Sequence, residues 1–229
     1  MSSIVNYQAF DKHAVITLNN GKVNAVSHQL IDELNEALDK AESAGLVIVI
    51  TGRLGMFSGG YDLKVMKESM DAAMALVERG STLTRRLLAF PQPVVAACSG
   101  HAIAKGAFIL LASDYRIGLD GEFKIGLNEV AIGMTMHKAG IELAAQRMPL
   151  AAFNRSVICA EMFSPQQAVH AGFLDVAVPE EKFQTTVDNV VAALSAIDKR
   201  AHHQTKLKAR ADVLSRLDAA IIEDRTSTL

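Results

Sequence analysis

The chain has 229 residues, half of them apolar, which is enough for one large domain with its own core. Its formal net charge of −2 gives no general attraction to nucleic acid or to anionic membranes, so we expect neither as a partner. Cys98 and Cys159 show no Cys-x-x-Cys and no regular Cys/His spacing, and we expect two buried thiols and no metal site.

The sequence contains no recognisable targeting segment. Residues 1–12 are polar without a long apolar run, and no stretch reaches the roughly 18 apolar residues of a membrane span. We therefore expect a cytoplasmic protein.

The first fifty residues predict strands and one helix. Two short runs rich in β-branched or aromatic residues, 4–10 and 13–19, predict a hairpin. Apolar residues at helical spacing predict a helix over 27–43, with Ser27 as its N-cap. The continuous β-branched run at 47–51 predicts a strand covered on both faces, as in parallel sheets.

The same order of elements returns further along the chain. A Gly-rich turn at 58–60 precedes a long helical region from about 63 to 89. We then expect a strand at 94–98, a turn at 99–100, a helix at about 106–113 and a strand at 114–119. This spacing implies right-handed crossovers in an α/β fold.

The chain after about residue 145 is predicted to be mostly helical, with boundaries at Pro149, Pro165 and Pro179. His202 and His203 fall in a polar helix and are expected to be solvated. We divide the chain into a core over residues 1–190 and a helical C-terminal region over residues 191–229.

One stretch indicates chemistry by itself. Gly126-Leu127-Asn128-Glu129 comes shortly after two Gly-containing turns, each of which could present a backbone N–H to a carbonyl oxygen. Removing a proton from a carbon beside a carbonyl leaves negative charge on oxygen, which must be met by donors already in place. A carboxylate facing two amide donors therefore predicts enolate chemistry.

Six motifs occur in order: Gly21 to Ala25, Phe57 to Leu63, Ser99 to Ala102, Ser113 to Ile117, Gly126 to Glu129, and Ala168 to Val178 followed by Pro179-Glu180-Glu181. Together, over nearly the whole chain, they resemble the crotonase (enoyl-CoA hydratase/isomerase) superfamily, and among its members the single-glutamate 3,2-enoyl-CoA isomerases. The resemblance implies a spiral of ββα units, a helical C-terminal region, acyl-CoA substrates and assembly as a homotrimer or dimer of trimers.

The resemblance assigns two oxyanion-hole donors. One is the backbone N–H of Tyr61, and the other matches Lys105, with Gly106 beside it. A Lys stands here where Gly is common, although a helix N-terminus would still supply free N–H groups and a favourable dipole. The Lys105 side chain could point to solvent or reach a CoA phosphate.

The resemblance also places the proton-transfer groups. Hydratases of the family carry Glu at the positions of Phe108 and Glu129, and this chain keeps only the second. Phe108 cannot transfer a proton and makes its side of the pocket drier, which argues against hydration. One base suffices to move a double bond from position 3 to 2, and burial should raise the pKa of Glu129 from about 4.3 toward neutrality.

Residues for binding the rest of the substrate follow from the resemblance. The CoA path is bordered by Lys22, Val23, Ala25, Gly59, Tyr61, Asp62 and Leu63. The acyl pocket is assigned to Met66, Phe108 and His137, with Met70 and Met74 as further candidates; these methionines could instead be plain core. His137 could be a second acid or base, or a packed residue.

Three functions remain open at this point. The first is enoyl-CoA isomerisation, the second is hydration or other enolate chemistry with His137 or another acid, and the third is acyl-CoA binding or scaffolding without catalysis. None needs a cofactor beyond the coenzyme A of the substrate. The chain stops about where family members continue into another helix, so its C-terminal region is expected to be shorter than is typical and its trimer contacts less secure.

Overall fold

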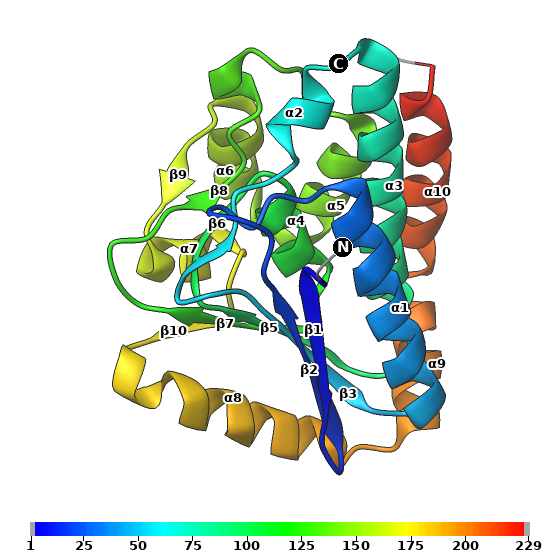
Figure 1. The fold of residues 1–229 in the computed structure, drawn as a ribbon, viewed down its shortest axis with the longest axis vertical. Coiled ribbons are helices and arrows are strands. Elements are labelled where there is room, and N and C mark those ends of the chain that lie inside the picture. Colours follow the sequence, from blue (N-terminus) through cyan, green and yellow to red (C-terminus); the bar gives the residue numbers. More distant parts are fainter. Residues whose placement is uncertain (1–2, 227–229) are drawn as a thin grey trace.

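The computed structural model describes residues 3–226, so residues 227–229 of the expected C-terminal region lie outside the described residues. A six-stranded sheet forms one wall of the molecule (Figure 1). Its strands, in spatial order, are β1 (Val5–Ala9), β2 (His13–Leu18), β3 (Val47–Thr51), β5 (Val94–Cys98), β7 (Tyr115–Leu119) and β10 (Val176–Val178). Within this sheet of the described residues, β1 and β2 pair antiparallel, and the other neighbouring strands pair parallel.

A second sheet has four short strands. They are β4 (Gly55–Ser58), β6 (Gly100–Ile103), β8 (Ile125–Gly126) and β9 (Met162–Phe163). After each of β3, β5 and β7 the chain adds one strand to this sheet, β4, β6 and β8 in turn, before it enters a helix. The expected spiral of ββα units is therefore confirmed.

The helices follow from local sequence signals. Helix α1 (His28–Ala44) begins after Ser27, whose side chain accepts from the Leu30 N–H as expected, and it ends at Gly45 in the left-handed region. The other helices of the spiral are α2 (Leu63–Met66), α3 (Met70–Ala89), α4 (Lys105–Ala112), the 3₁₀ helix η1 (Val130–Ile132) and α5 (Lys138–Arg147).

The rest of the described chain is mostly helical, as expected. It contains α6 (Leu150–Phe153), the π-helix η2 (Asn154–Ile158), α7 (Pro165–Ala171), α8 (Glu180–Ser195), α9 (Lys199–Ala209) and α10 (Ala211–Asp224). Figure 1 shows α8 along one face of the large sheet, while α1, α3 and α10 stand side by side away from α8.

Two apolar clusters sit on the two faces of the large sheet. Along β3, Ile48 and Ile50 belong to the main core, whereas Val47 and Val49 face α8 together with Val187 and Val191. The prediction that this strand is buried on both faces is confirmed. Among residues 3–226, no helix is long and apolar enough to cross a membrane.

Some local predictions were wrong. The helical region over 63–89 is two helices, because Ser69 takes an extended conformation and its side chain caps α3. Strands β4, β6, β8, β9 and β10 were not predicted; they have two to four residues each, too few to show periodicity. Cys98 is buried as expected, but Cys159 is exposed.

Candidate active site

The loop that precedes α1 is tied to the end of β4. Asn24 is fully buried, has a φ of 49°, and its side-chain amide donates to the carbonyl oxygens of Met56 (3.1 Å) and Phe57 (3.2 Å). The Gly59 N–H donates to the Val23 carbonyl at 2.7 Å. Asn24 belongs to the Gly21–Ala25 motif, but no role was predicted for it. The signal was its residue type, because Asn tolerates a positive φ better than most residues.

These contacts bring together the residues assigned to the CoA path. Lys22, Val23 and Ala25 lie on the loop, next to the turn of residues 59–63. Lys22 is exposed, and its carbonyl accepts from Arg53 at 2.7 Å. Asp62 caps α2 by accepting from the Lys64 N–H at 2.9 Å. The loop and the turn thus form one continuous edge.

Two turns meet at this edge. Gly60, before Tyr61, has a φ of 100°, and Ala104, before Lys105, has a φ of 51°. A Cβ built on Gly60 would lie 2.9 Å from the Ala104 Cβ and 3.6 Å from the Lys105 amide nitrogen. Any larger residue at position 60 would push the two turns apart.

The backbone amides of Tyr61 and Lys105 are available for a ligand. The Val26 N–H donates to the Gly60 carbonyl, and the Val26 carbonyl accepts from the Asp62 N–H. The N–H of Tyr61, which lies between Gly60 and Asp62, takes no part in this pairing. Lys105 is the first residue of α4, where an N–H has no partner within the helix. Gly106 packs against Ser58, so α4 begins close to β4.

Glu129 begins the loop after β8. Its carbonyl accepts from the N–H groups of Ile132 (3.1 Å) and Met134 (2.9 Å), and its side chain is buried, with the residue 6% exposed. Within residues 3–226, its Oε2 has no hydrogen-bond partner. Burial raises the pKa of Glu129 to about 7, while its own backbone N–H and the charge of Lys105 oppose the rise. This is the direction expected from the sequence.

The Lys105 side chain was assigned wrongly to solvent or to a CoA phosphate. The residue is 1% exposed and its ammonium donates to the Thr84 hydroxyl at 3.1 Å. It also lies 5.8 Å from the ring centre of Tyr61 and 5.9 Å from that of Phe108. The charged end of Lys105 therefore points into the protein, toward Thr84 of α3.

Phe108 and His137 pack on each other. Their ring centres are 5.3 Å apart with the rings nearly perpendicular, and Gly140 leaves the room that both rings fill. Both residues are buried. Burial, followed by the charge of Lys105, lowers the pKa of His137 to about 3, so this imidazole is neutral at neutral pH.

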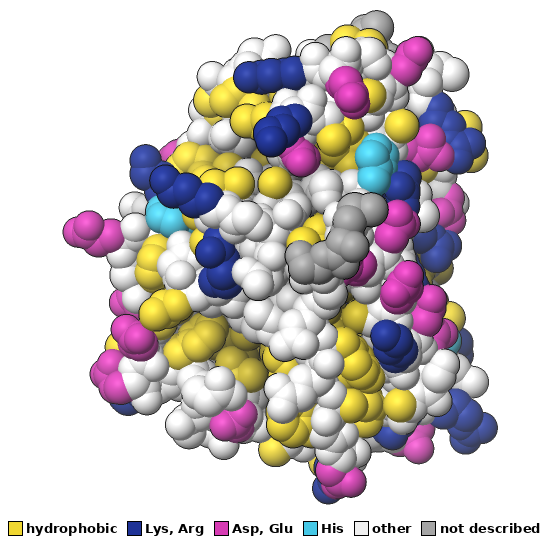
Figure 2. Space-filling model, in the orientation of Figure 1, with side chains coloured by type: hydrophobic (Ala, Val, Ile, Leu, Met, Phe, Trp, Pro, Cys, Tyr) yellow, Lys and Arg dark blue, Asp and Glu magenta, His cyan; other side chains and the backbone are white. Residues whose placement is uncertain are grey.

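A cavity of about 570 Å³ opens between α2 with the start of α3 on one side and residues 132–134, which follow Glu129, on the other. Met66 and Met70, two of the acyl-pocket candidates, line it together with Leu63, which was assigned to the CoA path. The other candidates Met74, Phe108 and His137 are not among its lining residues, and neither are Tyr61, Lys105 and Glu129. The remaining lining residues are Lys67, Ser69, Ala73, Ile132 and Met134. Ile132 and Met134 were missed, because only their position after Glu129 could have indicated them. In Figure 2, hydrophobic and basic side chains lie side by side over α2.

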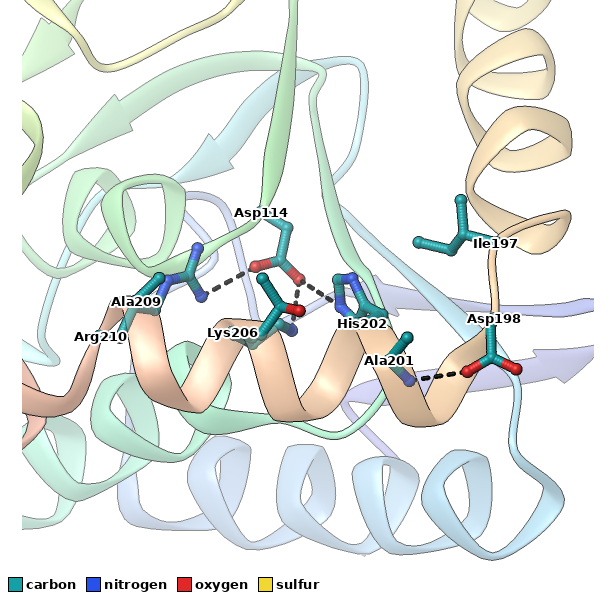
Figure 3. A pocket seen from close by; sticks show the side chains of 9 residues that line it. Asp114, Ile197, Asp198, Ala201, His202, Lys206, Ala209 and Arg210 are labelled. Carbon is teal, nitrogen blue, oxygen red and sulfur yellow. Dashed lines mark hydrogen bonds and ion pairs between the residues drawn. The ribbon is translucent and has the colours of Figure 1, made fainter.

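A second polar cluster lies away from these residues, under α9 (Figure 3). Asp114 accepts from Lys206 at 2.6 Å and pairs with Arg210 at 2.8 Å. His202 is mostly buried with its Nε2 at 4.0 Å from Asp114, so the expectation that it is solvated was wrong. Lys206 also donates to the carbonyls of Phe90 and Gln92. Lys206 thereby ties α9 to Asp114 and to the segment before β5.

The ββα spiral, with its two adjoining turns and a buried carboxyl group, has the architecture of the crotonase superfamily. Residues 11–227 match the enoyl-CoA hydratase/isomerase family, and the chain belongs to that family. Among residues 3–226, no group of His, Cys, Asp and Glu side chains could hold a metal ion.

Relatives with different reactions resemble the chain. A probable enoyl-CoA hydratase of Bacillus subtilis is 31% identical over 73% of this chain, and the match spans 66% of that relative. The human mitochondrial enoyl-CoA delta isomerase 1 is 32% identical over 89% of this chain and 69% of its own length. A crystal structure of a Pseudomonas syringae enoyl-CoA hydratase/isomerase family protein is 56% identical, with a TM-score of 0.97, and covers 99% of this chain and 98% of that one.

Proposed function

We propose that the protein is an enoyl-CoA isomerase that moves a double bond from position 3 to position 2 of an acyl-CoA. The Glu129 carboxylate takes a proton from C2, and the electron pair enters a dienolate whose negative charge rests on the thioester oxygen. The N–H groups of Tyr61 and Lys105 donate to that oxygen. The same carboxyl group returns the proton at C4, so no atom is gained or lost.

The observation that carries the proposal is that the site holds one carboxyl group poised for proton transfer. Glu129 has an unbonded carboxyl oxygen and a pKa of about 7, which suits both removing and returning a proton near neutral pH. Phe108 offers no second acid, and His137, with a pKa of about 3, is a poor proton donor at neutral pH. Hydration would need a second group to handle water.

The cavity supports an acyl chain as the ligand. It is bordered by α2, which follows the Tyr61 turn, and by Ile132 and Met134, which follow Glu129. In this proposal the acyl chain enters the cavity and the thioester lies outside it, toward the two turns. Its methionines adapt to chains of varied shape. In this proposal Lys22, Val23, Ala25, Gly59, Asp62 and Leu63 border the CoA moiety.

The test is to incubate the protein with 3-enoyl-CoA and, separately, with 2-enoyl-CoA of several chain lengths, and to follow products by chromatography and mass. We expect the 3-isomer to become the 2-isomer at constant mass. Glu129→Gln keeps the shape of the side chain and removes the base, so turnover should fall by a factor of about 100 or more.

Two other results would redirect the assignment. A gain of one water by the 2-enoyl substrate would establish a hydratase and require an acid that we have not assigned. No turnover of either substrate, together with measurable acyl-CoA binding, would establish a binding protein.

Assembly and location complete the proposal. By resemblance to the family we propose a homotrimer or a dimer of trimers in the cytoplasm, using no cofactor beyond the coenzyme A of the substrate. Light scattering on the purified protein would measure the oligomer directly.

A further inference from the structure

Helix α3 contacts the side chains of both residues that carry the proposed oxyanion donors. The Tyr61 hydroxyl donates to the Val77 carbonyl at 3.3 Å, and the Tyr61 ring lies against Gly80. The Lys105 side chain is buried, and its Nζ donates to the Thr84 hydroxyl at 3.1 Å. Positions 77, 80 and 84 are three and four residues apart, so they share one face of α3.

Gly80 leaves the room that the Tyr61 ring occupies. A Cβ built on Gly80 would lie 2.7 Å from Cε1 and 2.8 Å from Cζ of that ring, too close for either atom to stay in place. Glycine in the interior of a helix lowers stability relative to alanine, so its presence in the middle of α3 needs a reason. The contact with the ring supplies one.

Thr84 holds the Lys105 side chain whether or not Nζ is charged. The Thr84 hydroxyl directs its own proton to the carbonyls of Gly80 and Ser81, which leaves its oxygen to accept from Nζ. Burial lowers the pKa of Lys105 to about 7, but a neutral amine keeps two N–H donors, so this contact survives the loss of the charge. Nζ also lies 5.8 Å from the centre of the Tyr61 ring, so the two anchored side chains are neighbours.

The two turns themselves restrain their N–H groups only weakly. The peptide that carries the Tyr61 N–H follows Gly60, which has a φ of 100°, and the peptide that carries the Lys105 N–H follows Ala104, which has a φ of 51°. Glycine adopts many conformations, and a positive φ strains alanine, so such a backbone persists only where its surroundings hold it.

We propose that Gly80 and Thr84 are positioning residues of the active site. By anchoring the side chains of Tyr61 and Lys105 on one helix, they fix the separation and direction of the two N–H groups that receive the thioester oxygen. This inference rests on the proposed function, because it concerns the same oxyanion.

The position of α3 gives this arrangement a second use. Met70 and Ala73, at its start, line the cavity proposed for the acyl chain, and the anchors follow one to three turns later. One rigid element therefore sets where the acyl chain lies relative to the donors for its thioester oxygen. A displacement of about 1 Å between reacting groups is enough to slow an enzyme strongly.

Gly80→Ala tests the first anchor, because it displaces the Tyr61 ring and leaves both N–H groups in the chain. Donors that strengthen as charge develops on the oxygen act mainly on kcat. We expect kcat for 3-enoyl-CoA to fall by a factor of about 10 to 100, with KM changed by less than a factor of about three. Added to Tyr61→Ala, the same change should cost nothing further, since its Cβ then has room.

Thr84→Val tests the second anchor, because it keeps the shape of the side chain and removes the acceptor for Lys105. We expect kcat to fall by a factor of about 10. Thr82→Val is the matched control. Thr82 is exposed on the same helix, and its hydroxyl donates to the Glu78 carbonyl at 2.9 Å, so this variant should keep the kcat of the wild type.

Infrared difference spectra of bound octanoyl-CoA, labelled with carbon-13 at the thioester carbonyl, report on the two donors without turnover. Hydrogen bonds to the carbonyl oxygen weaken its double bond and lower its stretching frequency. We expect the wild type and Thr82→Val to lower the frequency equally, and Gly80→Ala and Thr84→Val to lose a large part of that shift. A loss of stability alone would not move the frequency in protein that is still folded.

The outcomes separate this inference from the proposed function. Each anchor is overturned if its variant keeps the wild-type kcat and carbonyl frequency, and the Gly80 anchor also if Gly80→Ala costs as much in Tyr61→Ala as in the wild type. If Gly80→Ala does not fold, Thr84→Val against Thr82→Val decides. A wild type that lowers the carbonyl frequency but turns over no enoyl-CoA contradicts the proposed function, and the spectra of the variants still test the anchors. Binding without any lowering overturns both proposals.

Discussion

At the scale of single residues, the burial of the Glu129 carboxyl group lowers the stability of the folded protein and favours proton transfer. A buried carboxyl oxygen without a hydrogen bond forgoes the solvation that it has in the unfolded chain. The same burial raises its pKa to about 7. Because the folded protein favours the protonated acid, the stability of the wild type should decrease as pH rises through about 7.

We therefore expect Glu129→Gln to be clearly more stable than the wild type at pH 8 and to gain much less at pH 5. The amide resembles the protonated acid, and at pH 8 the wild type must bury a carboxylate; the expected gain is on the order of 2 kcal/mol. Urea unfolding at the two pH values measures it. An equal gain at both would show that the effect comes from packing and not from charge.

The complementary experiment adds a second carboxyl group to the site, at position 108. Phe108→Glu would place a second carboxyl group beside the Lys105 ammonium, where the pairing offsets part of the burial cost. We expect hydration of 2-enoyl-CoA to rise by a factor of about 100 over the wild type. Phe108→Gln has nearly the same shape without a proton to transfer, so equal hydration by the two variants would contradict the two-carboxyl argument.

How far the sequence predicts the site differs from residue to residue. The motif around Glu129 and the apolar residue at position 108 were visible in the sequence, because they depend on residue type at a fixed spacing. The direction of the Lys105 side chain was not, since it depends on Thr84, a residue 21 positions away on another helix. Long-range contacts of this kind leave no local pattern.

At the scale of elements, predictions succeeded where an element is long enough to show a period. Helix α1 and strands β3, β5 and β7 lie where the sequence indicates. The second sheet was missed, although its strands β4 and β6 lead directly into the two turns of the site. Their pairing joins segments more than forty residues apart, and Gly100 at the start of β6 was interpreted as a turn residue only.

Helix α10 supports the site through one cap. The carboxylate of Asp224 accepts from the N–H groups of Lys138 (2.7 Å) and Ala139 (3.0 Å) at the start of α5. Such a cap satisfies two free donors and complements the helix dipole. It fixes the end of the segment that carries His137.

Asp224→Ala should therefore lower the free energy of unfolding by about 1–2 kcal/mol. Asp218→Ala on the same helix is the control, because it removes only the exposed pair with Arg85 and should cost less than about 1 kcal/mol. Chemical denaturation of the three proteins gives both values. Equal losses would mean that the cap contributes nothing beyond a surface charge.

At the scale of the whole molecule, the Asp114 cluster fastens the C-terminal helices to the spiral. Asp114 precedes β7 and accepts from the Val94 N–H at 2.8 Å, while Lys206 of α9 and Arg210, between α9 and α10, reach it from the C-terminal helices. Burial lowers the pKa of Lys206, and Asp114 opposes that change. One carboxylate thus connects a strand of the core with a segment more than ninety residues away.

A double-mutant cycle tests whether these charges act as a unit. Asp114→Asn leaves two cations without their carboxylate and should cost about 3–5 kcal/mol. Lys206→Met leaves the carbonyls of Phe90 and Gln92 without their donor and should cost about 2–3 kcal/mol. The double variant should lose at least about 1 kcal/mol less than the sum, because the second change no longer breaks an existing pair. Unfolding free energies from urea titration measure all four corners of the cycle, and strictly additive losses would show that Asp114 and Lys206 act independently.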